Sequence, residues 1–298
     1  MLDRVQRGGH VLLDAQDTDY IDPDVLDLIR DFKEKKAPAR GVEVSLLGFR
    51  NKYQLFDQIQ YVDYSTRELQ SALSPEQVLL ILREGHDRFR AGRRLTRDLG
   101  RQASATAKAQ HPLAVVLSCI DSRTPAELIF DLGVGDIFSV RIAGNVISRK
   151  VLASVEYGCA VAGAKLILVL GHTRCGAVSA AVNLLNETRT VAEATGCQHL
   201  DHIVSEIQQS TDPLTSQNVE RLSASEKESF IDAVAYRNVG RVVQLMRRQS
   251  QTLERLVQEG RVAIRGAMYD ITSGDIDFLT DSDVPSPDER SQLASNDR

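Results

Sequence analysis

The sequence predicts an α/β protein with a mostly parallel β-sheet flanked by helices, preceded by a short N-terminal βαβ segment. Short apolar runs rich in Val, Ile and Leu recur along the chain, which is typical of buried parallel strands. Capped or amphipathic helical stretches separate these runs, and strands that alternate with helices form sheets covered on both faces. The chain has 298 residues, of which 42% are hydrophobic, so it can bury such a core.

The first segment, residues 1–64, has the pattern strand, helix, strand. His10–Asp14 is predicted to be a buried strand, and Asp22 is the expected N-cap of a helix with Pro23 at its first position. Val42–Phe49 is predicted to be the second strand. A connection of this length between two strands indicates a parallel crossover unit. Two strands and one or two helices form only a thin domain.

The second unit covers residues 74–279. Ser74–Gln77 has a capping-box pattern and predicts an arginine-rich helix that continues to about Leu99. Apolar runs predict strands at Leu113–Leu117, Ile137–Ile142, Leu166–Leu170 and Val262–Arg265, with helices at 150–164 and 233–259. Residues 280–298 are rich in Asp, Ser and Pro, and we expect them to form a disordered tail.

Charge and composition exclude several classes of protein. The net charge is −5, from 36 Lys and Arg against 41 Asp and Glu, which argues against binding to nucleic acid or to an anionic membrane. Charged residues interrupt the most apolar region, so we expect no membrane span. The chain does not open with a signal-peptide pattern, and its four cysteines are too few for a disulfide scaffold. We therefore expect a cytoplasmic protein whose cysteines are metal ligands, reactive thiols or core residues.

Reactive side chains follow two of the predicted strands. Cys119, Asp121 and Arg123 come shortly after the first run of the second unit, whereas His172 and Cys175 follow the run at 166–170. The carboxyl ends of parallel strands meet at one edge of a sheet, where ligands bind, so these side chains can converge. Two thiolates and one imidazole form a zinc site with three protein ligands and one open position.

Asp121 and Arg123 suit the surroundings of such an ion. Two thiolates cancel the charge of Zn²⁺, and a carboxylate that accepts a hydrogen bond from bound water compensates for this loss. Arg123 is close enough in sequence to hold Asp121 by a bidentate pair. Without that pair, Asp121 can fill the fourth position itself. Taken alone, a cysteine after a strand is explained by core packing, and Asp121 with Arg123 is explained by a surface turn with an ion pair. The combination of these motifs in one chain is what specifically indicates a metal site.

Together, the segments Cys119–Arg123 (Cys-x-Asp-Ser-Arg) and His172–Gly176 (His-x-x-Cys-Gly) resemble the β-class carbonic anhydrases. The resemblance covers about residues 74–279 and includes Arg141–Asn145 and Gly266–Asp270. It implies an enzyme with one Zn²⁺ per subunit that reversibly hydrates carbon dioxide to bicarbonate and a proton. It also implies homodimers or higher assemblies of dimers, such as a tetramer.

The same resemblance assigns roles to individual residues. The implied metal ligands are Cys119, His172 and Cys175, the implied catalytic dyad is Asp121 with Arg123, and the implied substrate contacts are Gln110 and the backbone N–H of Gly176. Family members with an allosteric bicarbonate site carry Trp three residues before the first Cys ligand. This chain has Val116 there and no Trp. We therefore expect the non-allosteric type, with Asp121 paired to Arg123 and water as the fourth ligand.

Residues 1–64 resemble the second half of a STAS domain, the cytoplasmic module of sulfate-permease-type anion transporters. The matching pieces are Leu12–Ala15, Tyr20–Asp24 and Val42–Phe49. This partial resemblance implies either a piece of a transporter–carbonic anhydrase fusion or a remnant kept as a dimerisation arm. In the first case the partner is an anion transporter, and the enzyme lies at the inner face of the membrane.

Two alternative functions remain open from the sequence. One is hydrolysis of CS₂ or COS on the same zinc scaffold, because these substrates resemble carbon dioxide in shape. The other is a non-catalytic, zinc-stabilised module that regulates a transporter. The segment Cys197–His202 is expected to be solvated surface rather than a second metal cluster, and Cys159 is expected to be a core residue.

Overall fold

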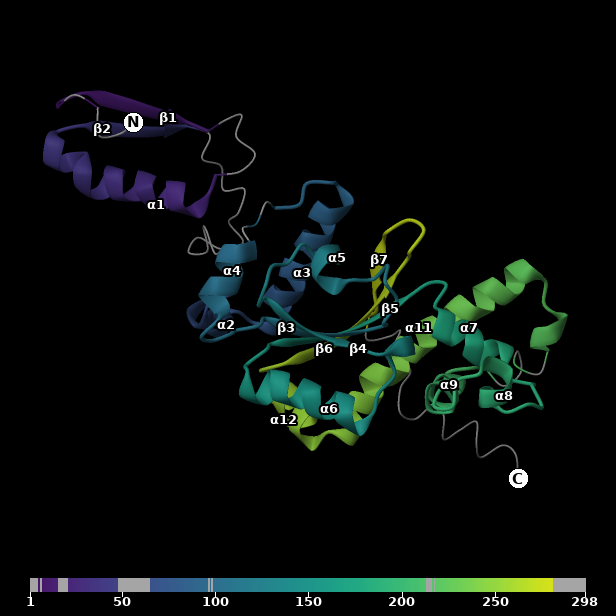
Figure 1. Ribbon diagram of the computed structural model, residues 1–298. Helices are drawn as coiled ribbons and strands as arrows, with labels where there is room; N and C mark the ends of the chain where they lie inside the picture. Colours follow the sequence, from purple (N-terminus) through teal and green to yellow (C-terminus); the bar gives the residue numbers. More distant parts are fainter. Residues whose placement is uncertain are drawn as a thin grey trace.

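A five-stranded β-sheet forms the centre of the molecule, and helices pack on both of its faces (Figure 1). The computed structural model describes residues 5, 7–15, 21–47, 65–95, 97, 99–212, 216 and 218–280. The strand order in the sheet is β4-β3-β5-β6-β7. The first four strands are parallel, and β7 runs antiparallel to β6. The predicted α/β class with a mostly parallel sheet is therefore confirmed.

The central strands are buried on both faces, which explains their unbroken apolar sequences. The five strands of the sheet are β3 (Ala114–Ser118), β4 (Ile137–Arg141), β5 (Leu166–His172), β6 (Ala263–Tyr269) and β7 (Ile276–Phe278). Of these, β3 and β5 are buried throughout, whereas the edge strands β4 and β7 are partly exposed. Ser118, the last residue of β3, pairs with Leu170 of β5. This register places Cys119, the next residue, level with the carboxyl end of β5.

Alternate side chains of β3 enter two different cores. Val115 and Leu117 pack with the helices α6 (Arg149–Glu156), α7 (Gly176–Asn183), α9 (Asp201–Gln208), α11 (Ala224–Gln249) and α12 (Gln251–Gln258). Ala114 and Val116 pack on the other face with α3 (Pro75–Arg90) and α5 (Ala126–Ile129). Two layers of helices thus cover the sheet, as strands of period two require.

Several helix boundaries differ from the predictions. The arginine-rich helix ends at Arg90 rather than near Leu99, because Gly92 adopts a φ of 66° that turns the chain out of the helix. The helix expected at 150–164 continues after α6 as a π-helical turn, Tyr157–Val161. The helix expected at 233–259 is divided at Ser250, whose side chain accepts from the N–H of Leu253 and caps α12. Several short elements are not predicted from the sequence: α2 (Arg67–Ala72), α4 (Leu99–Thr106), the 3₁₀ turns Ala143–Asn145 and Val219–Arg221, and α8 (Val191–Thr195).

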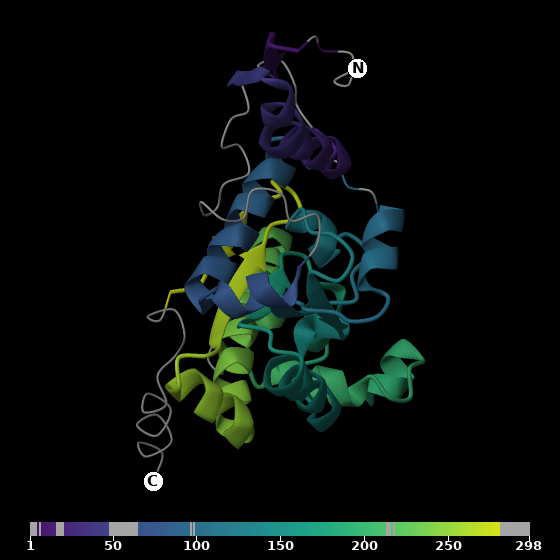
Figure 2. The same cartoon turned by 90° about the vertical axis from the view of Figure 1, so that its left-hand side faces the viewer.

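The N-terminal unit has the predicted order of strand, helix and strand. The strands β1 (His10–Asp14) and β2 (Glu43–Leu47) are parallel, and α1 (Pro23–Asp31) connects them together with the turns Phe32–Lys36 and Pro38–Arg40. Phe32, Ala37 and Val42 form its small core. Figures 1 and 2 show this unit at one end of the molecule, apart from the large sheet. The link at 48–64 and the expected tail from 281 lie outside the described residues.

Candidate metal centre

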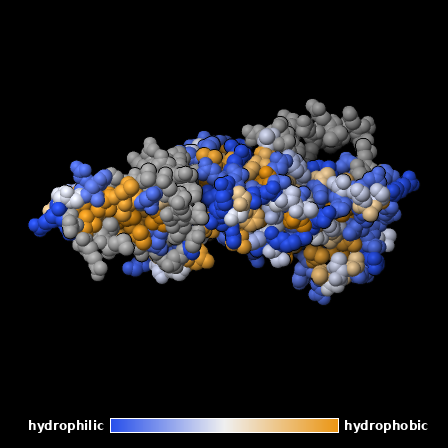
Figure 3. Space-filling model, turned by 90° about the horizontal axis from the view of Figure 1, so that it is seen from above, coloured by the Kyte–Doolittle hydropathy of each residue, from blue (hydrophilic) through white to orange (hydrophobic). Residues whose placement is uncertain are grey.

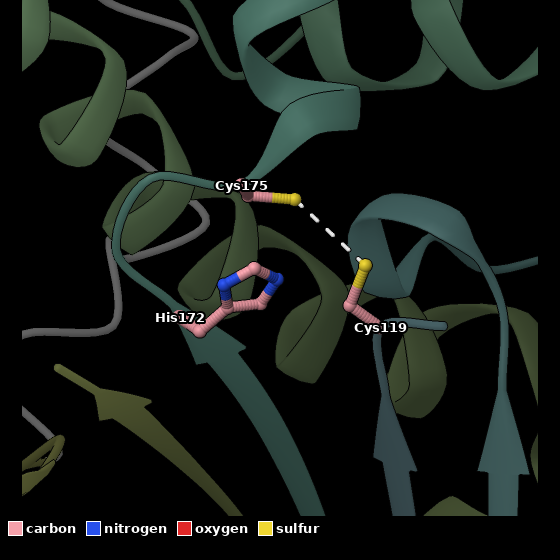
Figure 4. A group of neighbouring side chains, drawn as sticks. All are labelled: Cys119, His172 and Cys175. Atoms are coloured by element: carbon pink, nitrogen blue, oxygen red, sulfur yellow. Dashed lines mark hydrogen bonds between the residues drawn. The ribbon is translucent and has the colours of Figure 1, made fainter. Parts of the chain in front are cut away.

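Three potential metal ligands converge at the carboxyl edge of the sheet. Cys119 directly follows β3, His172 is the last residue of β5, and Cys175 is the N-cap of α7 (Figure 4). Their ligand atoms all lie within 4.8 Å of one another. The two sulfur atoms are 3.8 Å apart, and all three residues are buried. Among the described residues, no other His, Cys, Asp and Glu side chains meet in this way.

A tight turn after β5 brings Cys175 back to the site. Arg174 adopts a φ of 53°, in the left-handed region that non-glycine residues rarely occupy. Its backbone N–H donates to Asp232 at 2.7 Å, and the N–H of Thr173 donates to the carbonyl of Tyr269 at 3.0 Å. These bonds to α11 and to β6 hold the strained turn, so that the side chains of His172 and Cys175 face the same space.

The hydrogen bonding of His172 determines which ring nitrogen is available to a metal. Nδ1 lies 2.9 Å from the carbonyl oxygen of Thr173. A carbonyl only accepts, so Nδ1 carries the proton and Nε2 presents a lone pair. Nε2 is buried without a hydrogen-bond partner, an arrangement that is unfavourable unless a ligand satisfies it. An imidazole nitrogen beside two sulfurs is a donor set that fits Zn²⁺.

The two thiols have very different acidities without a metal. A hydrogen bond from the Cys175 thiol lowers the pKa of Cys119, and the backbone N–H groups of Gly144 and Asp121 act in the same direction. The neighbouring Cys119 sulfur and burial raise the pKa of Cys175. Cys119 is therefore the more acidic thiol of the pair, and both sulfurs must be deprotonated when they bind a metal.

Asp121 is locked beside the cluster by Arg123. The guanidinium donates from Nε to Oδ1 at 2.9 Å and from Nη2 to Oδ2 at 2.7 Å, and the backbone N–H of Arg123 donates to Oδ1 at 3.0 Å. These bonds from Arg123 hold the pKa of Asp121 well below its usual range. Oδ2 remains 4.0 Å from Nε2 of His172, so the carboxylate lies next to the cluster while its oxygens are engaged elsewhere.

Arg141 of β4 fixes the backbone of the same loop. Its guanidinium donates to the carbonyl oxygens of Cys119 and Asp121. The hydroxyl of Thr124 also donates to the carbonyl of Asp121, at 3.1 Å. The resemblance includes the segment Arg141–Asn145 but assigns no role to Arg141. Its position on the strand next to β3 explains why it reaches both carbonyls.

The predicted substrate contacts occupy different places. Gly176 is the first residue of α7, beside the metal ligands, and a Cβ built on it meets no atom within 4 Å. A side chain would thus have room at this first position of the helix, and the residue is exposed. Gln110 is exposed and precedes β3, which places it towards the amino end of that strand, whereas Cys119 follows the carboxyl end. The chain thus brings together the other six predicted site residues, but not Gln110.

The two remaining cysteines lie outside the cluster, as expected. Cys159 is buried, and burial raises its pKa to about 12. Cys197 is exposed, and no metal-ligand group forms around it among the described residues.

Comparison with known proteins identifies the family. The family model described as "Carbonic anhydrase" matches residues 114–276, more than half of the chain. The chain belongs to the carbonic anhydrase family. This match contains β3, β4, β5 and β6, the first residue of β7 and the complete metal centre, and residues 1–64 lie outside it.

Named relatives and a solved structure agree with this assignment. The chain is 34% identical over 195 residues to carbonic anhydrase 2 of Mycobacterium tuberculosis, which covers 65% of this chain and 87% of the relative. It is 50% identical over 108 residues to a carbonic anhydrase of Mycolicibacterium smegmatis, covering 36% of this chain and 52% of that relative. A β-carbonic anhydrase of Aspergillus fumigatus has 26% identity and a TM-score of 0.52, covering 66% of this chain and 88% of its own. The predicted β-class fold of this carbonic anhydrase is therefore confirmed.

Proposed function

We propose that this carbonic anhydrase is a zinc enzyme that reversibly hydrates carbon dioxide, with one Zn²⁺ held by Cys119, His172 and Cys175. The observation that carries the proposal is the buried, unpartnered Nε2 of His172 within 4.8 Å of both sulfurs. Structural zinc sites have four protein ligands. Here the nearest further candidate, Asp121, is engaged by Arg123, which supports a catalytic site rather than a non-catalytic module.

The residues of this site have distinct tasks in the proposed reaction. When bound, Zn²⁺ supplies a Lewis acid that makes water nucleophilic near neutral pH. Asp121, kept ionised by Arg123, would accept a hydrogen bond from the attacking water. This bond would orient a lone pair of the water oxygen towards carbon dioxide. The N–H of Gly176 at the start of α7 donates to bicarbonate, where the positive end of the helix dipole favours an anion.

Zinc content and isotope exchange test this proposal together. Metal analysis is expected to give one zinc per chain in the wild type and in Asp121→Asn, because Asp121 is not one of the three ligands. Loss of ¹⁸O from labelled carbon dioxide is expected to fall about 10²- to 10⁴-fold in the variant, since a positioned proton acceptor is lost. Asp277→Asn, an exposed carboxylate on β7, is the control.

Two results would overturn the proposal. One is a wild-type protein that binds no zinc, and the other is an Asp121→Asn variant with undiminished loss of ¹⁸O.

The alternative substrates are tested by assaying the same preparations with COS and CS₂. Faster turnover of either than of carbon dioxide would favour the hydrolase alternative.

We also propose that the active form is a homodimer or a tetramer of such dimers. Four exposed apolar side chains lie in segments that follow β3 or α6: Ile120, Leu128, Tyr157 and Val161. The ring of Tyr157 lies 6.4 Å from that of Phe138 on β4, an edge strand of the large sheet. Burial of such side chains favours association. Tetrameric β-carbonic anhydrases of Sordaria macrospora share this fold, with 23% identity and a TM-score of 0.50.

Gln110 provides a sharp test of this assembly. Because it lies towards the opposite end of β3 from Cys119, we propose that it reaches the substrate of a second copy. Neither Gln110→Ala nor Cys119→Ser is expected to be active alone, but mixed dimers should combine the intact Gln110 of one copy with the intact metal site of the other. Co-refolded in equal amounts, they should regain about a quarter of the wild-type activity. No regain in dimers of confirmed mixed composition would contradict contact in trans.

Residues 1–64 are proposed to form a partial STAS-like domain that couples the enzyme to an anion transporter at the cytoplasmic side of a membrane. Among the described residues, no further strand pairs with the two-stranded sheet of this unit, and Leu12 and Leu28 are exposed. Figure 3 shows hydrophobic side chains gathered over this end of the molecule. Among the described residues, no helix has the length and apolar character needed to cross a membrane.

Co-purification with a co-expressed sulfate-permease-type transporter tests the coupling. Wild type is expected to be retained, whereas Leu12→Asp with Leu28→Asp should be lost, since both side chains are already exposed and their replacement should leave the fold intact. Failure of wild type to be retained would refute this part of the proposal without affecting the enzyme assignment.

A further inference from the structure

A chain of buried hydrogen bonds leads from the Cys119 sulfur to helix α11. The N–H of Gly144 donates to Sγ of Cys119 at 3.4 Å, and the carbonyl of Gly144 accepts from Nδ2 of Asn238 at 2.9 Å. The hydroxyl of Ser210 is 3.2 Å from Oδ1 of Asn238. Asn238 is fully buried and Ser210 is 3% exposed, so water does not compete for these bonds.

The two partners of Asn238 fix the orientation of its amide. The carbonyl of Gly144 only accepts, so the amide nitrogen must face it. The amide oxygen then faces Ser210, whose hydroxyl donates to it. Reversing the amide would place two acceptors against each other at Gly144, which is unfavourable in a buried site. Ser210 and Gly144 therefore select one arrangement of Asn238.

An asparagine at this position is a polar exception within an apolar face. One turn earlier and one turn later on α11, Val234 and Val242 are fully buried in the hydrophobic core. A buried amide is unfavourable unless its hydrogen bonds are satisfied, and an apolar residue would fill the same space without that requirement. The amide of Asn238 donates to the carbonyl of Gly144. Gly144 belongs to the turn whose N–H donates to the proposed metal ligand Cys119.

The turn itself depends on close approach. Gly144 has a φ of 67°, and a Cβ there would lie 2.5 Å from Cδ1 of Ile207 and 3.4 Å from the Cβ of Ala177. The turn is thus pressed between Cys119 on one side and the helices α7 and α9 on the other. Asn238 holds the carbonyl of the residue whose N–H points at the sulfur.

We propose that Asn238, oriented by Ser210, is a positioning residue for the metal centre: it holds Gly144 so that a backbone N–H donates to the Cys119 sulfur. That bond withdraws electron density from one of two thiolates only 3.8 Å apart and so favours their joint presence around a divalent ion. The inference deepens the proposed zinc site and rests on it.

Metal affinity and the spectrum of a cobalt-substituted site test this role in the full-length protein. Zinc affinity is measured by competition with a chelator, and Co²⁺ reports the sulfur-to-metal charge-transfer band. Asn238→Ala is expected to weaken zinc binding about 10- to 100-fold and to move the band to longer wavelength, because the thiolate becomes a better electron donor. Ser210→Ala should change the zinc affinity and the wavelength of the band in the same direction, but by less. It provides the test if Asn238→Ala folds poorly.

Val242→Ala is the matched control, since it removes buried volume from the same face of α11 without touching the turn at Gly144. It is expected to lower the melting temperature while leaving the affinity and the band at wild-type values. The inference is overturned if both Asn238→Ala and Ser210→Ala keep wild-type affinity and spectrum, or if Val242→Ala changes them equally. A wild-type protein that binds neither Zn²⁺ nor Co²⁺ would instead refute the proposed function itself.

Discussion

Replacing Arg123 by Leu should separate metal binding from catalysis. The side chain of Arg123 makes two charge-assisted hydrogen bonds to Asp121, of 2.9 and 2.7 Å. The Arg123 side chain is 53% exposed, so solvent screens the charge of the pair, and the bidentate geometry is what fixes the position of Asp121. Oδ2 of Asp121 is only 4.0 Å from Nε2 of His172. Once released, the carboxylate can reach the open metal position.

The expected result is therefore a fall in kcat/KM of about 10- to 100-fold, with zinc content and affinity equal to or above those of the wild type. Stopped-flow carbon dioxide hydration gives the rate, and metal analysis with chelator competition gives the zinc content and affinity. Arg123→Lys keeps the charge but lacks the bidentate geometry, and should fall between the two. Loss of zinc in parallel with activity, or full activity in Arg123→Leu, would refute this reasoning.

Further changes have equally definite outcomes. Cys119→Ser should abolish stoichiometric zinc binding and carbon dioxide hydration, and a variant with full zinc content would show that the ligand assignment is wrong. Gly144→Ala should lower the free energy of unfolding by about 2–4 kcal/mol, measured with urea, because its φ is 67° and Ile207 leaves no space. Gly176→Ala, which has open space around it, should change that free energy by less than about 1 kcal/mol. In metal-free protein, the depressed pKa of Asp121 stabilises the folded state fully above about pH 4. The stability advantage of wild type over Arg123→Leu should shrink as the pH falls below that value, and a constant difference down to pH ~2 would contradict this.

The convergence of the metal centre was predictable because it follows from a general property of parallel sheets. Cys119 and His172 each lie at the end of an apolar run, and adjacent parallel strands bring such ends together. The structure places β3 and β5 side by side, so two segments far apart in sequence meet without any further assumption. The pairing of Asp121 with Arg123 was equally local, since only Ser122 separates them.

The features that were missed depend on long-range contacts or on weak local patterns. Nothing in the sequence around Asn238 indicates that it reaches Gly144, because the two are joined only by the packing of α11 against the turn. The strand β7 has three residues, Ile276–Phe278, which is too short for an alternating pattern to distinguish. The end of α3 did carry a signal, because Gly92 follows the helix closely, but the arginines beyond it favour helix as well.

The order of the ligands along the chain has a consequence for how the protein is made. Cys119 emerges from the ribosome before His172 and Cys175, and its thiol has no partner ligand until β5 has been synthesised and has paired with β3. Even then the turn at Gly144 is supported by α11, whose residues come later still. Metal loading of the nascent chain is therefore a late event in biosynthesis, and a ribosome stalled before β5 would display a single reactive cysteine of this cluster rather than a metal site.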